Sequence, residues 1–163
     1  TYHFILKPGS EDRNIMSSLE DIDNFNDYDI FINSKLFLAE NGKMQNYPRI
    51  YFNSTKDSIA SMEIKYYARG LNNHEAKENI KTIDYQYISD TNTIFLNPYF
   101  EINSKKWRAQ DVKITVSIPV DSKLIIDKKL SALIDIEDIS EEYDDAEMCG
   151  KEIIVTESGF KMK

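Results

Sequence analysis

With 163 residues, a formal net charge of −8, 41% hydrophobic residues and 12% aromatic residues, the chain has the composition of a folded acidic protein. The hydrophobic content excludes global disorder, and the negative charge argues against nucleic acid or an anionic membrane surface as the partner. The single cysteine, Cys149, excludes an intramolecular disulfide and a cysteine-rich zinc site.

The chain begins TYHFILKPGS, with neither an initiator methionine nor a signal peptide. We therefore expect it to be part of a longer protein whose targeting or anchoring segments precede Thr1. No apolar run in the chain reaches the roughly 18–20 residues needed to cross a bilayer. We expect His3 to lie in an N-terminal strand. Ile15, Leu19 and Ile22 fall near one helical face, which indicates either a short helical turn or an irregular surface segment.

Beyond this stretch the hydrophobic residues recur with a period of two, which is typical of β-strands. Many short strands separated by polar turns predict an all-β fold, mostly antiparallel, built as a sandwich, a barrel or a stacked-sheet solenoid. The clearest alternation falls at residues 62–66, 83–87 and 112–118, and shorter strand-like runs at 29–33, 35–40, 49–53, 93–97, 123–127 and 151–156.

One segment breaks this pattern and predicts a short helix over residues 72–81. Asn72 is a favourable N-cap, and Glu75 follows it at the spacing of a capping box. Ala76 and Ile80 lie four residues apart and share one face, so the helix can lie against a sheet. A helix between two strands indicates a crossover rather than a tight hairpin.

Residues able to support catalysis are few and scattered. The only histidines are His3 and His74, and nucleophilic catalysis at Cys149 would need the fold to bring one of them alongside. No nucleotide-binding, nucleophile-elbow or zinc-protease motif is present. We therefore expect no catalytic residue, no cofactor and no enzymatic activity. A hydrolase with paired carboxylates is a third hypothesis, for which the sequence contains no motif.

The strongest local concentration of charge is the acidic run at residues 135–147. Calcium prefers carboxylate oxygens as ligands, which makes Asp144 and Asp145 candidate cation ligands. The run lacks the central glycine and terminal glutamate of an EF-hand loop, as does the acidic segment 21–29. We expect a solvated acidic loop and no metal site.

The stretch KKWRAQDVKITVSIP, residues 105–119, places the only tryptophan beside an arginine, directly ahead of the most regular strand. A tryptophan at a strand entrance buries a large area while its ring N–H seeks one partner. Arg108 can hold a carboxylate with two hydrogen bonds or stack on an aromatic ring. Because the adjoining strand is so regular, we expect Trp107 and Arg108 to clamp the strand rather than bind a ligand, and Arg108→Ala to reduce stability.

Four segments, in this order, resemble the C-terminal region of Bacteroidetes-type PspC-domain proteins, which are related to phage-shock-protein C and carry an all-β domain of the toast-rack type. They are residues 64–87, 93–100, 105–119 and 148–160. Leu96 and Val112 also match the family pattern. Eight further matching residues, here termed the signature residues and expected to be structural, are Tyr67, Arg69, Gly70, Tyr99, Phe100, Trp107, Arg108 and Gln110.

The sequence also departs from the family pattern. Asn97 stands where relatives usually have aspartate, and Val120 and Asp121 stand where relatives often have glycine. The segment after Gly150 lacks the expected aromatic residue. These departures indicate a diverged member. No run of Gly, Ser or Pro divides the chain, so we expect residues 1–163 to form one β-rich domain, with residues 1–60 assigned from pattern alone and residues 60–163 resembling the PspC-associated domain.

The resemblance implies a location in the cell envelope, transmembrane segments upstream of Thr1, a link to envelope stress signalling and no catalytic residues. Our first hypothesis is a non-enzymatic, extracytoplasmic (periplasmic) sensing or interaction domain of an inner-membrane stress-response regulator, with an envelope or membrane protein as its partner. The alternative is an adhesin-like β domain that binds carbohydrate or another ligand through exposed aromatic residues.

Overall fold

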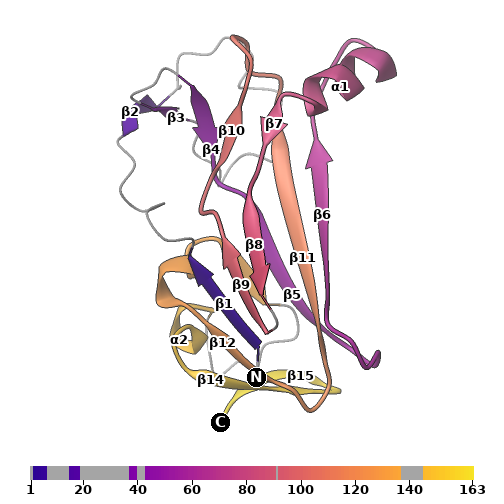
Figure 1. Cartoon of the computed structure of the whole chain (residues 1–163), viewed down its shortest axis with the longest axis vertical. Helices are drawn as coiled ribbons and strands as arrows, with labels where there is room; N and C mark the ends of the chain where they lie inside the picture. The colour runs from indigo at the N-terminus through magenta and orange to yellow at the C-terminus, as the bar shows by residue number, and fades with distance from the viewer. Residues whose placement is uncertain (1, 7–14, 19–36, 40–42, 91, 137–144) are drawn as a thin grey trace.

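The chain folds into three β-sheets arranged along an elongated molecule (Figure 1). The computed structural model describes residues 2–6, 15–18, 37–39, 43–90, 92–136 and 145–163. Within these residues most strand pairs are antiparallel, and the main helix connects two different sheets. The predicted all-β fold with one short crossover helix is therefore confirmed.

The four-stranded sheet runs along most of the long axis and has the order β13-β5-β11-β6. Strand β11 pairs in parallel with β5 and antiparallel with β6. Its alternation predicts a buried face, and Ile114 at its centre is fully buried, opposite Ile50 and Ile64 of the two neighbours. The bounds of the strands are β5 (Arg49–Thr55), β6 (Ser61–Tyr67), β11 (Asp111–Pro119) and β13 (Ile134–Ile136).

The six-stranded sheet occupies the end of the molecule near the two termini in Figure 1 and has the order β15-β14-β12-β1-β9-β8. The N-terminal strand β1 lies inside this sheet and runs parallel to both of its neighbours. His3 lies in this strand, as predicted. The bounds are β1 (Tyr2–Leu6), β8 (Tyr87–Asp90), β9 (Thr93–Leu96), β12 (Lys123–Ile126), β14 (Glu152–Thr156) and β15 (Gly159–Met162).

The five-stranded sheet has the order β2-β3-β4-β10-β7 and is antiparallel throughout. The bounds are β2 (Ile15–Ser18), β3 (Phe37–Ala39), β4 (Met44–Asn46), β7 (Ile83–Asp84) and β10 (Phe100–Ile102).

The helical turn suggested for residues 15–22 is wrong over the part that the structure describes. Ile15–Ser18 form strand β2, which pairs with β3. Three apolar residues at helical spacing are a weak signal when a neighbouring strand offers backbone partners. Residues 19–22 and the predicted strand at 29–33 lie outside the described residues.

Helix α1 (Asn73–Ile80) carries the chain from β6 to β7, in another sheet. The Asn72 side chain accepts a hydrogen bond from the Glu75 amide at 2.9 Å, as expected of an N-cap. The Glu75 carboxylate accepts from the Leu71 amide, one residue earlier than in a capping box. No residue of the helix is fully buried, so it lies on the surface. Two shorter helical segments are η4 (Lys128–Leu130) and α2 (Asp145–Met148).

All three sheets contribute to a continuous hydrophobic core. None of the helices among the described residues is long and apolar enough to cross a membrane. The largest fully buried side chains are Phe52, Phe100, Ile50, Leu96, Ile102, Ile114, Ile118, Leu124, Ile126, Leu130 and Met148.

Candidate functional site

Three segments meet at the end of the four-stranded sheet that carries α1 (Figure 1). They are the residues that follow β6, the C-terminal end of α1 and the loop that precedes β11. Five of the signature residues belong to these segments, although Arg69 and Gly70 are separated from Trp107, Arg108 and Gln110 by a helix and four strands. The fold therefore brings two separate parts of the signature together.

A ring of five hydrogen bonds joins these segments. The Arg69 amide donates to the Arg108 carbonyl (2.8 Å), and the Arg108 amide donates to the Gln110 side-chain oxygen (2.6 Å). The Gln110 side-chain nitrogen donates to the Thr82 hydroxyl (3.2 Å), which donates to the Asn79 carbonyl (2.6 Å). The Asn79 side-chain nitrogen donates to the Arg69 carbonyl (2.5 Å) and closes the ring. We refer to these five residues as the Gln110 ring.

Gln110 supplies one acceptor and one donor to the ring from a fully buried side chain. The residue before it, Ala109, has a left-handed backbone with φ of 54°. This unusual conformation for a residue with a side chain accompanies the turn in which Gln110 reaches back to the Arg108 amide. The buried Gln110 amide stabilises this geometry in particular, because water cannot replace a hydrogen-bond partner that is lost when the geometry changes.

Gly70 has a steric role beside the ring. A Cβ atom at this position would lie 2.7 Å from the carbonyl carbon of Glu75 and in conflict with the backbone nitrogen of Ala76. The first turn of α1 therefore packs directly on the Gly70 backbone. Any larger residue would displace the helix from the end of β6.

The aromatic signature residues lie in different environments. Phe100 is fully buried in β10, and Trp107 is 4% exposed within the same core. Tyr99 is half-buried, and its amide donates to the Asn97 side-chain oxygen. Tyr67, at the end of β6, is exposed. Three of these four residues fit a packing role, whereas Tyr67 faces solvent.

Arg108 takes part in the ring through its backbone, not through its charge. Its guanidinium donates to the Trp107 carbonyl at 3.4 Å, and no carboxylate of the described residues pairs with it. The buried ion pair at the start of β11 is instead formed by Arg49 and Asp111, at 2.5 Å. Sequence reasoning missed this pair, because the two residues are far apart in the chain and only the parallel pairing of β5 with β11 brings them together.

The Arg49–Asp111 pair is asymmetric in its burial. Asp111 is fully buried, and its second oxygen accepts from the Val112 amide, while about a third of the Arg49 side chain is exposed. Burial raises the pKa of the Asp111 carboxyl above its ordinary value, although Arg49 and the Val112 amide oppose that shift. The pKa of Arg49 is also raised: its burial acts against this, but attraction to Asp111 outweighs the burial.

The residues considered for catalysis do not assemble around Cys149. His74 lies on α1, whereas Cys149 is buried directly after α2, at the opposite end of the molecule (Figure 1). His3 lies in β1, nearer to α2, and is half-buried. Among the described residues no group of three His, Cys, Asp or Glu side chains could hold a metal ion. Asp144 lies outside the described residues, and Asp145 begins α2.

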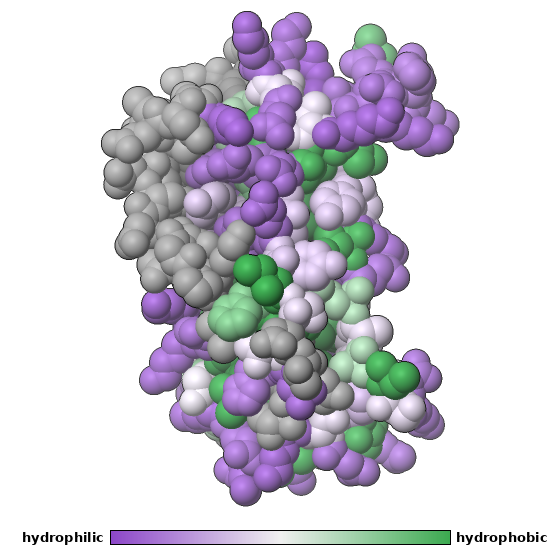
Figure 2. Space-filling view, viewed as in Figure 1, coloured by the Kyte–Doolittle hydropathy of each residue, from purple (hydrophilic) through white to green (hydrophobic). Residues whose placement is uncertain are grey.

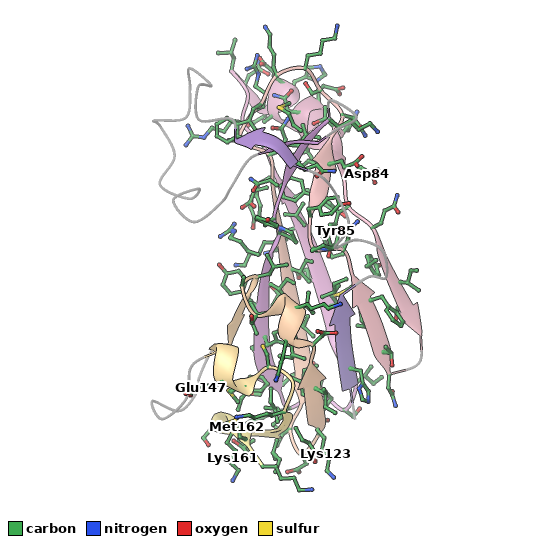
Figure 3. All side chains as sticks on the ribbon, turned by 90° about the vertical axis from the view of Figure 1, so that its left-hand side faces the viewer. Asp84, Tyr85, Lys123, Glu147, Lys161 and Met162 are labelled. Atoms are coloured by element: carbon green, nitrogen blue, oxygen red, sulfur yellow. The ribbon has the colours of Figure 1, made fainter. Side chains whose placement is uncertain are left out.

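A second candidate site is the set of exposed tyrosines where β6 approaches the β7–β8 segment. Tyr66 and Tyr87 are 38% and 44% exposed, while Tyr85 is nearly buried and donates its hydroxyl to the Asn97 carbonyl. Burial, followed by electrostatic interaction with Tyr87 and Asp84, raises the pKa of the Tyr66 phenol. Figure 3 shows Asp84 and Tyr85 in the half of the molecule that carries α1.

The surrounding surface is less polar than the ends of the molecule. In Figure 2 hydrophobic and near-neutral residues gather along the middle of the face, over β8, while both ends are mostly hydrophilic. Tyrosines of this kind can stack on a flat ligand or pack against a protein, because each offers an apolar ring and a polar tip. The Gln110 ring, in contrast, uses its polar groups internally and serves to hold the structure.

A comparison with protein families supports the toast-rack resemblance of the sequence. The model of a family described as "ToastRack found in some PspC" matches residues 38–163. The match contains the whole Gln110 ring, the ion pair and the exposed tyrosines, and it begins upstream of β4 and β5. No curated protein and no solved structure was found to match the chain.

We expect Gln110→Ala to lower the free energy of unfolding by about 1–3 kcal/mol, because it leaves the buried Arg108 amide without an acceptor. Arg108→Ala keeps both backbone bonds of the ring and should cost less. Urea unfolding of the two variants and the wild type would measure the difference. If Arg108→Ala were the more damaging substitution, the guanidinium and not the ring would be the clamp.

The buried carboxyl of Asp111 predicts a pH dependence. Because the pKa of Asp111 is raised, its carboxyl keeps a proton in the folded state at pH values where the unfolded state has lost it. This window begins near the ordinary aspartate pKa of about 4. The stability contributed by Asp111 should therefore fall as pH rises through the window between the ordinary and the raised value. As pH rises across that window, the unfolding free energy of the wild type should fall relative to that of Asp111→Asn. If the wild type instead gained stability relative to Asp111→Asn, attraction to Arg49 would outweigh burial.

Proposed function

Because the chain belongs to the family of toast-rack domains found in some PspC proteins, we propose that it is the sensing or interaction domain of a membrane-anchored regulator of the envelope stress response. The family match carries this proposal, since it covers residues 38–163 and ties the chain to PspC. In this proposal the domain lies outside the cytoplasm, in the periplasm, and the transmembrane segments are elsewhere in the protein.

The proposed mechanism is binding without catalysis. A partner protein of the envelope or membrane binds a sheet edge or face of the domain. The membrane-anchored part of the protein then transmits the signal that the partner is bound. The structure offers suitable surfaces, because β6 and β8 are edge strands and both carry exposed tyrosines. The Gln110 ring would hold the end of β6 in place.

Deleting residues 38–163 from the full-length protein in its own host tests this function. We expect the truncated protein to remain in the membrane fraction and the transcriptional response to envelope damage to change, because the sensing surface is gone. Gln110→Ala in the full-length protein, which weakens the fold without removing the surface, is the matched comparison. An unchanged response in cells that make the truncated protein would contradict the proposal.

The exposed tyrosines favour a second candidate function, the binding of an envelope carbohydrate. Tyr66 and Tyr87 are both exposed and lie on the edge strands β6 and β8, and exposed aromatic rings can stack on a sugar. We expect a glycan bound by the wild type to be lost by Tyr66→Ala and by Tyr87→Ala, measured on a glycan array. Tyr47→Ala, at a half-buried tyrosine outside this group, is the control. Wild-type signals no higher than background would exclude this candidate.

A further inference from the structure

Strand β6 is an open edge of the four-stranded sheet. It pairs with β11 along one side, and no described strand pairs with its other side. Its backbone makes no hydrogen bond to any described element other than β11. Figure 1 shows β6 at the margin of the molecule, with α1 beyond its C-terminal end. A seven-residue edge of this kind is a template for another strand unless something blocks it.

We propose that the strand added to this edge is β6 of a second copy of this chain, in antiparallel pairing about a two-fold axis at Ile64. The two four-stranded sheets would then form one continuous sheet across the dimer. In this arrangement the same surface is used by both copies, as in most symmetric dimers. The proposal does not depend on the sensing role, because it concerns self-association and not the ligand sensed.

The alternation of β6 restricts the register. Met62 and Ile64 pack against the core, and Glu63 and Lys65 point to the opposite face. Residues directly opposite each other in a sheet have their side chains on the same face. A two-fold axis midway between two successive residues would pair core-facing residues with outward-facing ones, which this rule forbids. The axis must therefore pass through a residue, and only an axis at Ile64 pairs all seven residues of Ser61–Tyr67.

Charge selects the same register. With the axis at Ile64, Glu63 of each copy lies opposite Lys65 of the other, so the two pairs are complementary. Moving the axis by one residue sets Glu63 against Glu63, or Lys65 against Lys65. Like charges directly opposite one another destabilise a sheet. In the single chain Glu63 and Lys65 pair with each other at 3.2 Å, an exposed contact that contributes little and is free to exchange.

Two exposed hydrophobic residues flank β6, at unequal distances from Ile64. Ile59 precedes β6 and is 76% exposed, and Leu71 follows it and is 93% exposed, the two highest values among the large hydrophobic residues that the structure describes. With the axis at Ile64, Ile59 is level with Arg69 of the other copy, so Ile59 and Leu71 both lie beyond the ends of the paired strands. Tyr66 lies opposite Met62 of the second copy. Self-pairing thus covers part of Tyr66, which is 38% exposed in the single chain.

Sedimentation equilibrium of the chain over a range of concentrations tests the proposal. We expect a monomer–dimer equilibrium in the wild type. Glu63→Lys and Lys65→Glu should each raise the dimer dissociation constant by about tenfold or more, because each creates like-charge pairs across the axis. The double variant Glu63→Lys/Lys65→Glu should return close to wild type, since complementarity is restored with the charges exchanged.

Mixing the two single variants should yield a heterodimer, in which lysines of one chain face glutamates of the other. Glu157→Lys and Lys161→Glu are matched controls, because they make the same charge changes at exposed residues of the β14–β15 hairpin and should leave the dissociation constant unchanged. A wild type that stays monomeric up to about 1 mM would overturn the proposal. Single variants whose dimers are as stable as the wild-type dimer would also overturn it.

Discussion

The Gln110 ring is the constraint on which the arrangement of the sheets depends. It ties the end of β6, the end of α1 and the start of β11 with bonds that satisfy one another's donors and acceptors. Because β11 is the strand on which both β5 and β6 align, holding its entrance fixes the registers on both sides. The Gln110 side chain is fully buried, so losing either of its two partners would leave a buried polar group unsatisfied. The signature residues of this region are therefore needed together rather than singly.

The ion pair of Arg49 and Asp111 acts at the same strand entrance by a different route. Burying a carboxylate is costly, and the opposing influences on the pKa of Asp111 show that its partner does not fully offset the cost. Such a pair contributes little to stability, but shifting β5 along β11 would leave Asp111 buried without its partner. The pair therefore penalises wrong registers, which suits a parallel pairing between strands that are distant in the chain.

Much of this fold could be predicted, and the failures have a physical pattern. Long alternating runs such as 112–118 were found as strands because burial on one face imposes the period. The strands Met44–Asn46, Phe100–Ile102 and Ile134–Ile136 were missed, since three residues show no period and their pairing comes from neighbours in space. Trp107 is buried in the core, whereas the clamp expected from the sequence relies on the charge of Arg108. The structure uses the Arg108 backbone and Gln110, whose bonds depend on a turn that residue order does not reveal.

The position of β1 sets an order for folding. Its parallel neighbours are β9 and β12, whose residues are synthesised long after Tyr2–Leu6 have left the ribosome. Strand β1 can therefore pair on one side only once Thr93–Leu96 are available, and its other edge stays unpaired until Lys123–Ile126 follow. Contacts between residues so distant in sequence close slowly, because the intervening chain must be ordered first. The six-stranded sheet is thus completed around a strand made well before its partners, and the edges of β1 need protection until those partners arrive.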